Sequence, residues 1–230
     1  MDAADATPAS TSSSTARRRR APSPGRASAA STPLPPPPPP PPSTTSPTTP
    51  NPLTVAFLHP DLGLGGAERL IVDAAAGLAG AGHDVTVWTS HWEPARAFAE
   101  TRSGAFPVRV AGDWLPRHVC GGLHILFAAL RGLWLALVVA LYAPASTSVF
   151  IVDQVSVGVP ILRLCRRRAR VLFYCHFPDQ LLARRSSRLM AAYRAPFDAL
   201  EEATTGAAHA VVVNSAFTRA TYMATFRRLA

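Results

Sequence analysis

The stretch Val55-Ala-Phe-Leu-His-Pro-Asp-Leu-Gly-Leu-Gly-Gly-Ala-Glu-Arg69 decides the fold that we predict for this chain. An apolar run at 53–58 predicts a strand, the turn-rich loop 59–66 follows it, and an Ala-rich amphipathic segment extends from Ala67 to about Gly80. Strand, glycine loop and helix in this order are typical of α/β domains that handle nucleotides. Gly65 and Gly66 leave the backbone accessible, and a helix that begins at Ala67 directs its unpaired N–H groups to the same place, which makes the loop a candidate phosphate site.

Two specific phosphate-binding motifs can be tested against this loop. A P-loop requires a lysine, and the chain contains none. The dinucleotide fingerprint G-x-G-x-x-G matches Gly63 and Gly65, but Glu68 stands where the third glycine is required. A tight strand-to-helix turn that binds no ligand therefore stays open as the alternative.

The amino-terminal residues 1–52 differ in composition from the rest of the chain. They are almost wholly Ala, Ser, Thr, Pro and Arg, with a basic cluster at 17–20 and a proline run at 35–42. Such a segment has too little apolar surface to fold, so we predict a disordered tail, and it lacks the apolar core of a secretory signal peptide. Its five Arg and two Asp account for +3 of the formal net charge of +9, which leaves +6 for residues 53–230. A basic folded part suits phosphate-bearing ligands or an anionic membrane surface, and the chain has no nucleic-acid recognition motif.

Apolar runs alternate with helical patterns along residues 53–230. Strands are predicted at 53–58, 85–89, 108–110, 149–152, 171–175 and 210–213, and helices near 67–80, 122–142, 156–166, 188–205 and 216–228. This alternation predicts an α/β fold with a Rossmann-like parallel sheet. The last two strands are continuous apolar runs, which predicts that they are covered on both faces. Pro196 is expected to kink or split the helix that contains it, and Cys120, Cys165 and Cys175 are expected to be reduced and mostly buried.

Polar residues follow all six predicted strands. They are His59-Pro-Asp61, Ser90-His-Trp92, Gly112-Asp-Trp114, Asp153-Gln154, His176-Phe-Pro-Asp-Gln180 and Asn214-Ser215. The carboxyl ends of parallel strands meet at one edge of a sheet, where ligands of such folds bind. We therefore predict a functional rim there. Glu201 and Glu202 are candidate catalytic acids, although adjacent carboxylates on a helix usually form a solvated face.

The segment Leu123–Tyr142 is nearly long enough to cross a membrane, but His124 and Arg131 interrupt it. Its uninterrupted part, residues 132–143, would form about 18 Å of helix, against a hydrocarbon core of about 30 Å. Two interpretations of this helix are equally favoured. One is a crossover helix buried on the sheet. The other is a helix in the membrane interface with Arg131 at the headgroups and Trp134 as an anchor. A true span ranks third.

The motifs of residues 53–228 resemble glycosyltransferase family 4, in particular its members that build dolichol-linked oligosaccharides. The resemblance rests on His59-Pro-Asp-Leu-Gly-Leu-Gly-Gly-Ala-Glu-Arg69, Thr89-Ser-His91, Val108-Arg-Val-Ala-Gly-Asp-Trp-Leu-Pro116, Val152-Asp-Gln-Val-Ser156, Phe173-Tyr-Cys-His-Phe-Pro-Asp-Gln-Leu-Leu182, Tyr193-Arg-Ala-Pro196, Glu201-Glu-Ala-Thr-Thr-Gly206 and Val213-Asn-Ser-Ala-Phe-Thr218. It implies that residues 53–230 are the amino-terminal, acceptor-side half of a two-domain GT-B glycosyltransferase. The family's carboxyl-terminal donor-binding domain is expected to be absent from the chain, which ends at Ala230.

The resemblance also implies a reaction and its site. Mannose would move from GDP-mannose to a dolichol-diphosphate-linked oligosaccharide, first α-1,3 and then α-1,6, with configuration retained. His176 would be the catalytic side chain beside the donor sugar, Gly65 and Gly66 the donor or phosphate loop, and Asp113, Asp153 and Gln154 the acceptor cleft. No cofactor or metal is expected, in agreement with a sequence that has no D-x-D motif.

The same resemblance places the protein at the cytosolic face of the endoplasmic reticulum membrane. The implied partners are the dolichol-linked acceptor, this membrane and other glycosyltransferases of the pathway. Three other readings stay open: a different family 4 glycosyltransferase, a non-catalytic half-enzyme that binds membrane or a partner, and a scaffold whose proline run recruits SH3- or WW-type modules.

Overall fold

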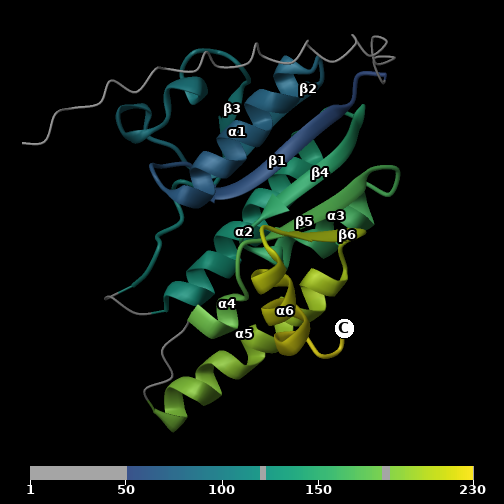
Figure 1. Cartoon of the computed structure of the whole chain (residues 1–230). Coiled ribbons are helices and arrows are strands. Elements are labelled where there is room, and N and C mark those ends of the chain that lie inside the picture. Colours follow the sequence, from purple (N-terminus) through teal and green to yellow (C-terminus); the bar gives the residue numbers. More distant parts are fainter. Residues whose placement is uncertain (1–50, 120–122, 183–186, 230) are drawn as a thin grey trace, which may run out of the picture. The chain divides into compact units, whose positions relative to one another are not determined.

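A computed structural model of the protein describes residues 51–119, 123–182 and 187–229 (Figure 1). Its six strands are β1 (Thr54–Asp61), β2 (Asp84–His91), β3 (Val108–Val110), β4 (Thr147–Asp153), β5 (Arg170–Cys175) and β6 (Ala210–Val213). They form one sheet in the order β3-β2-β1-β4-β5-β6, with every neighbouring pair parallel. The predicted Rossmann-like parallel sheet is confirmed. The predicted amino-terminal tail lies outside the described residues, except for Asn51 and Pro52.

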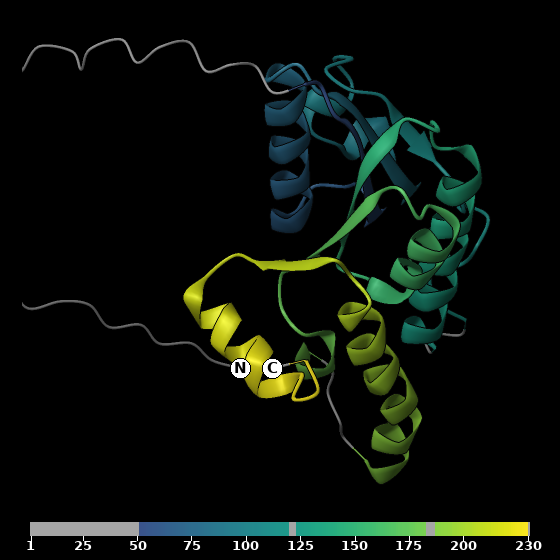
Figure 2. The ribbon, with the colours of Figure 1, turned by 90° about the vertical axis from the view of Figure 1, so that its right-hand side faces the viewer.

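Helices alternate with the strands, except between β2 and β3, and α6 follows the last strand. They are α1 (Gly66–Gly80), α2 (His124–Tyr142), α3 (Val159–Cys165), α4 (Asp179–Leu182), α5 (Arg188–Gly206) and α6 (Ala216–Thr225), with 3-10 turns η1 (Pro94–Arg96), η2 (Ala99–Thr101) and η3 (Ser156–Gly158). α1 covers one face of the sheet, whereas α2 and α3 cover the other (Figure 2).

Strand β1 shows how the sequence builds both cores. Val55 and Phe57 pack in the cluster of α1, whereas Ala56 and Leu58 pack in the cluster of α2 and α3. Alternate residues of a strand point to opposite faces, so an uninterrupted apolar run serves a sheet that is covered on both sides. The central strands can therefore hold their carboxyl ends in fixed positions.

Three expectations about packing hold only in part or not at all. β6 is the edge strand of the described sheet, and Val212 is 39% exposed, so β6 is not covered on both faces. α5 runs from Arg188 to Gly206 as one helix with Pro196 inside it, so the proline does not split it, and a kink there stays a prediction. Cys175 is buried, but Cys165 is exposed at the end of α3; Cys120 lies outside the described residues.

The helix α2 combines a buried face with an exposed apolar face. Leu135, Ala136, Val139 and Ala140 are buried against the sheet and α3. The opposite side carries Leu130, Trp134, Leu137 and Leu141, all at least 37% exposed, at the spacing of one helical stripe. By length and composition the helix could cross a membrane, with a third of its apolar window buried in the fold.

Arg131 does not belong to the exposed face of α2. Its side chain is 7% exposed, and its Nη2 donates to Oδ1 of Asp61 at 2.7 Å. The expectation that Arg131 reaches lipid headgroups is therefore wrong, because the arginine points toward the end of β1. Next to it, Gly132 lets α2 pack closely against the segment after β4, because a Cβ at this position would lie 3.0 Å from methyl groups of Val155 and Val157.

Candidate active site

A cleft of about 640 Å³ opens at the carboxyl edge of the sheet. Its walls come from the ends of β1, β4 and β5, the start of α1, the first turns of α2, and α5. The lining residues are Pro60, Asp61, Ala67, His124, Ile125, Ala128, Ala129, Gln154, Val155, Ser156, Val157, His176, Phe177, Asp179, Leu182, Arg194, Phe197, Leu200, Glu201 and Thr204. Apolar walls with a few charged side chains are typical of a site for a small molecule.

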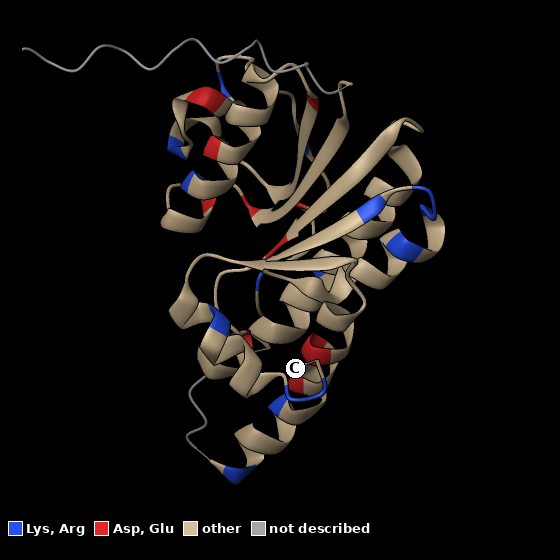
Figure 3. Ribbon diagram, turned by 45° about the vertical axis from the view of Figure 1, so that its right-hand side comes forward, with Lys and Arg blue, Asp and Glu red and all other residues tan. Residues whose placement is uncertain are grey.

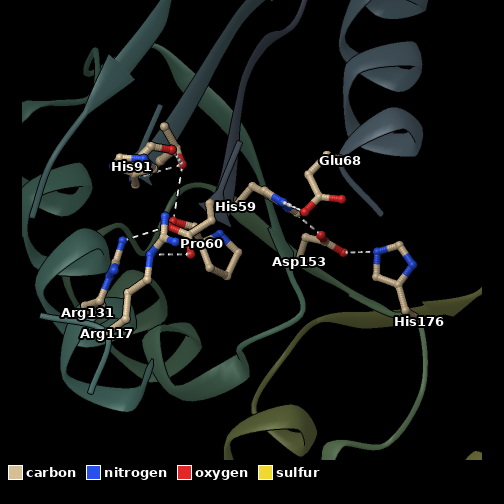
Figure 4. A network of polar contacts seen from close by, with 10 residues as sticks. His59, Pro60, Glu68, His91, Arg117, Arg131, Asp153 and His176 are labelled. Atoms are coloured by element: carbon tan, nitrogen blue, oxygen red, sulfur yellow. Dashed lines mark hydrogen bonds and ion pairs between the residues drawn. The ribbon is translucent and has the colours of Figure 1, made fainter. Parts of the chain in front are cut away.

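Two histidines share one buried aspartate beside this cleft (Figure 4). Nδ1 of His59 lies 2.6 Å from Oδ2 of Asp153, and both side chains are fully buried. Nε2 of His176 lies 2.7 Å from Oδ1 of the same carboxylate, although the two groups are not aligned for a hydrogen bond. His176 is 23% exposed and lines the cleft, so it is the member of the group that a ligand can touch.

The pleat and register of the sheet bring these three residues together. Leu58 of β1 pairs with Val152 of β4, so the next residues, His59 and Asp153, lie side by side at the strand ends. Asp153 in turn pairs with Tyr174 of β5. His176 follows two residues later, with its ring 4.7 Å from that of Tyr174. A parallel sheet therefore collects residues that are 94 and 23 positions apart in the sequence.

Gln154 occupies a strained backbone position at the mouth of the cleft. Its φ is +61°, in the left-handed region that non-glycine residues rarely adopt. Such strain costs of the order of 1 kcal/mol and is held in place by the surrounding structure. The residue lines the cleft directly after Asp153, so the turn delivers an amide side chain to the site that the sequence predicted.

Asp61 holds two arginines at the opposite wall of the cleft. Its Oδ1 accepts from the buried Arg131, and its Oδ2 lies 3.4 Å from Nε of the half-exposed Arg117. Removal of the carboxylate would leave the Arg131 guanidinium buried without this partner. The contact between Asp61 and Arg131 fixes this wall of the cleft to the middle of α2.

The glycine loop leads into α1 without backbone strain. Gly65 is the N-cap in an extended conformation, and no side chain caps the helix. A Cβ on Gly65 would lie 2.2 Å from Oε2 of Glu68, because that carboxylate folds back over the loop. A Cβ on Gly66 would meet no protein atom within 4 Å. The space beside Gly66 is therefore open, whereas the acidic Glu68 covers Gly65.

Asp113 lies apart from the other predicted residues. Its carboxylate is 58% exposed and contacts Nδ1 of His91 at 2.7 Å, and it does not line the cleft. Of the predicted rim, His59, Asp153, Gln154 and His176 converge, whereas His91 and Asp113 form a second pair. Asn214 accepts from Thr218 at the start of α6. A contribution of Asp113 to ligand binding stays a prediction.

Glu201, one of the two candidate catalytic acids on α5, faces the cleft. It lines the cleft from α5 and accepts the backbone N–H groups of Asp179 and Gln180 at 2.7 and 3.1 Å. Burial raises the pKa of Glu201 to about 7, and the nearby negative charge of Asp179 adds to the effect, while the two N–H groups oppose it. The expectation of a solvated carboxylate is therefore wrong for Glu201. Its apolar helix neighbours, Phe197 and Leu200, line the same cleft.

The raised pKa of Glu201 predicts a pH-dependent stability. The folded carboxyl binds its proton more tightly than the unfolded one, so its ionisation opposes folding progressively between about pH 4.5 and about pH 7. We expect the free energy of unfolding of the wild type to fall by about 2 kcal/mol over this range because of Glu201, and Glu201→Gln to lack this fall. Urea unfolding at both ends of the range measures it, and an identical pH dependence in the variant would contradict the assignment.

Cysteine chemistry is disfavoured at this site. Burial raises the pKa of Cys175 to about 12, and the negative charges of Glu201 and Asp153 contribute. The thiol is therefore not a nucleophile at neutral pH. In residues 51–119, 123–182 and 187–229, no group of three or more His, Cys, Asp and Glu side chains is arranged to hold a metal ion.

Part of the positive charge of the folded part lies away from the cleft. Figure 3 shows basic residues around the turn between α3 and β5. Arg166, Arg167 and Arg168 lie in this turn, and Arg170 is the first residue of β5. The acidic residues Asp61 and Asp153 lie at the carboxyl ends of their strands. The net charge therefore does not by itself provide a phosphate site at the cleft.

Comparison with known proteins identifies the family of the chain. The sequence model of the family described as Glycosyltransferase Family 4 matches residues 64–228. The chain is 52% identical over 177 residues to "Alpha-1,3/1,6-mannosyltransferase ALG2" of Kluyveromyces lactis, covering 76% of this chain and 35% of that protein. It is 50% identical over 184 residues to the protein of the same name from Homo sapiens, covering 79% of this chain and 44% of that protein.

A solved structure supports the fold alone. Sucrose-phosphate synthase from Thermosynechococcus elongatus superposes with a TM-score of 0.51 at 16% identity, over 76% of this chain and 45% of that one. The chain spans less than half the length of each of these relatives. The family match covers well over half of the chain, and the predicted family resemblance is confirmed: the chain belongs to glycosyltransferase family 4.

Proposed function

We propose that this protein takes part in mannosyl transfer from GDP-mannose to a dolichol-diphosphate-linked oligosaccharide, first α-1,3 and then α-1,6, with configuration retained. The observation that carries the proposal is the identity of about one half to α-1,3/1,6-mannosyltransferases from a yeast and from human, over 76% and 79% of this chain. The His59–Asp153–His176 group and its cleft supply a site for that reaction.

The geometry suggests a different role for each residue of the site. His176 is exposed to the cleft and can hold a sugar hydroxyl or stabilise charge on the mannose as its bond to the diphosphate breaks. Asp153 is 1% exposed and acts on the substrate through His176, whereas Gln154 can donate or accept at the cleft surface. With no metal or cofactor proposed, the open backbone at Gly66 serves the diphosphate or the acceptor.

Residues 53–230 would form the acceptor-side half of a two-domain GT-B enzyme. In such an arrangement a second domain supplies most contacts with the nucleotide of the donor. The cleft described here opens at the carboxyl edge of the sheet, where ligands of doubly wound folds bind.

Gly66→Val tests the role of the open loop. The new side chain meets no protein atom in the position of its Cβ, so we expect an unchanged melting temperature. We expect mannosyl transfer to fall by about tenfold or more, because the branched side chain would fill the space through which a ligand approaches the backbone. Wild-type kinetics would show that the loop is only a turn.

The exposed stripe of α2 suggests how a lipid-linked acceptor is reached. We propose that Leu130, Trp134, Leu137 and Leu141 lie in the interface of the endoplasmic reticulum membrane, on its cytosolic face, with Trp114 stacked edge-on against Trp134. The inner face of the helix stays packed on the domain. This contact would keep the cleft near an acceptor whose dolichol chain remains in the bilayer.

Leu141→Lys tests this membrane contact. Withdrawing one leucine from an apolar interface costs about 1.5–3 kcal/mol, so we expect binding to phospholipid vesicles to weaken by about tenfold or more. Leu164→Lys is the matched control, because Leu164 is 66% exposed against 67% for Leu141 but lies on α3. Vesicle sedimentation measures both variants, and equal losses would contradict a specific role of α2.

A chimera tests the proposed reaction. Residues 53–228 replace the matching segment of the human relative, and transfer of labelled mannose is followed with a short-chain lipid-linked acceptor. We expect product from GDP-mannose and lipid-linked acceptor. Transfer only from another nucleotide sugar, or only to a soluble acceptor, would favour a different family 4 reaction. No product from a folded chimera would favour a non-catalytic binding role.

A further inference from the structure

His59 contributes to the site without touching the cleft. Its side chain is fully buried in β1, and it is not among the residues that line the cavity. Its Nδ1 lies 2.6 Å from Oδ2 of Asp153, and its Nε2 lies 4.0 Å from Oε1 of Glu68 at the start of α1. A polar side chain at such depth is costly to bury, so its contacts must offset that cost. The short contact with Asp153 is the obvious one.

The carboxylate of Asp153 divides its two oxygens between two histidines. Oδ2 faces His59 and Oδ1 faces His176. An ionised carboxylate can only accept hydrogen bonds, and two lone pairs at 2.6 or 2.7 Å repel each other, so the ring nitrogen that faces each oxygen is favoured when it carries a hydrogen. This assigns Nδ1–H to His59 and Nε2–H to His176. Nδ1 of His176 is then the nitrogen left with a lone pair, and it can accept a hydroxyl proton from a ligand.

We infer that His59 is a positioning residue, which holds the Asp153 carboxylate so that Asp153 keeps His176 in the Nε2–H tautomer. The contact between His176 and Asp153 is close but not aligned as a hydrogen bond. The bond from His59, by contrast, fixes the rotation of the carboxylate. Loss of that bond would let Oδ1 turn away and release the choice of tautomer at His176. The inference rests on the proposed function only in naming a sugar hydroxyl as the ligand.

His59→Asn and His59→Gln form a matched pair of variants. The side-chain amide of Asn places an N–H donor near the position of Nδ1, so it can still bond to Asp153. The amide of Gln reaches toward the position of Nε2, near Glu68, and leaves Oδ2 of Asp153 without its donor. Both changes are neutral and polar, so a general effect of losing the imidazole would affect both.

The ring nitrogens of His176 report the tautomer by nitrogen-15 NMR of the full 230-residue chain with labelled histidine, at about pH 8, where free imidazole is neutral. His176→Asn assigns the signal. We expect a single Nε2–H tautomer in the wild type and in His59→Asn, and a mixture in His59→Gln. Asp153→Asn should also give a mixture, which keeps the test available if His59→Gln does not fold. The same tautomer in every variant, or a mixture in the wild type, would overturn the inference.

Kinetics of mannosyl transfer provide a second readout. We expect His59→Gln to lower kcat by about 10- to 100-fold with KM within about twofold, and His59→Asn to recover most of that loss of kcat. Equal losses of kcat in both variants, in step with equal losses of melting temperature, would mark His59 as merely structural. The tautomer measurement needs neither donor nor acceptor, so it decides on His59 even where the transfer assay contradicts the proposed function.

Discussion

His176→Ala is expected to lower mannosyl transfer by about 10²–10³-fold while the protein keeps its fold. The side chain lines the cleft, and its main polar contact is with Asp153. Removal of a positioned acid–base or charge-stabilising group typically has an effect of this size. The imidazole is not part of either hydrophobic cluster, so the free energy of unfolding should change little. Transfer by the chimera and its melting temperature measure the two effects.

His83→Ala is the control for this prediction. His83 precedes β2, at the amino edge of the sheet, where its Nδ1 accepts the backbone N–H of Leu53. It therefore lies at the opposite end of the strands from the cleft, and its removal should leave transfer near the wild-type rate. Unchanged turnover in His176→Ala would remove this histidine from the mechanism. An equal loss in His83→Ala would point to a general effect on folding.

Asp61→Ala is expected to destabilise the domain by about 3 kcal/mol. The reason is the buried guanidinium of Arg131, which is 7% exposed and donates to the Asp61 carboxylate. A buried charge that loses its partner lowers the free energy of unfolding by more than the intact pair contributes to it. Urea unfolding measures the change in the free energy of unfolding.

Two further variants separate the buried pair from its exposed neighbour. Arg131→Met in the Asp61→Ala background should recover much of the loss, since no buried charge then remains. Arg117→Ala should stay within about 0.5 kcal/mol of the wild type, because Arg117 is half-exposed and 3.4 Å from Asp61. If Asp61→Ala unfolds like Arg117→Ala, the Arg131 contact does not stabilise the domain.

Much of the fold could be predicted because each strand and helix shows its own pattern of apolar residues in the local sequence. The apolar runs that predicted six strands contain or overlap every strand observed, and β3 and β6 match the predicted bounds. Their alternation with helices fixes a parallel sheet with crossovers. The errors arose where neighbours decide burial. A run of valines in β6 reads as a covered strand, but its position at the edge of the sheet leaves Val212 exposed.

The site was predictable only as a rim. Strand ends show which polar residues share an edge, so His59, Asp153, Gln154 and His176 could all be named. The pairs could not be predicted, because they depend on register and side-chain rotation. Nothing in the local sequence separates Asp153, which bridges two histidines, from Asp113, which pairs with His91 near the surface. The burial of Glu201 and the contact of Arg131 with Asp61 likewise arise from helix packing.

Photo-crosslinking of a lipid-linked acceptor to the 230-residue chain tests whether the acceptor binds in the cleft beside His176. The acceptor carries a photoreactive group on its terminal mannose, and mass spectrometry identifies the labelled residues. We expect labels on the cleft lining next to His176, at residues 154–157 and 176–179, which an excess of unlabelled acceptor suppresses. Suppressible labels at the amino edge of the sheet, or labels that excess acceptor does not suppress, would contradict an acceptor site at this cleft.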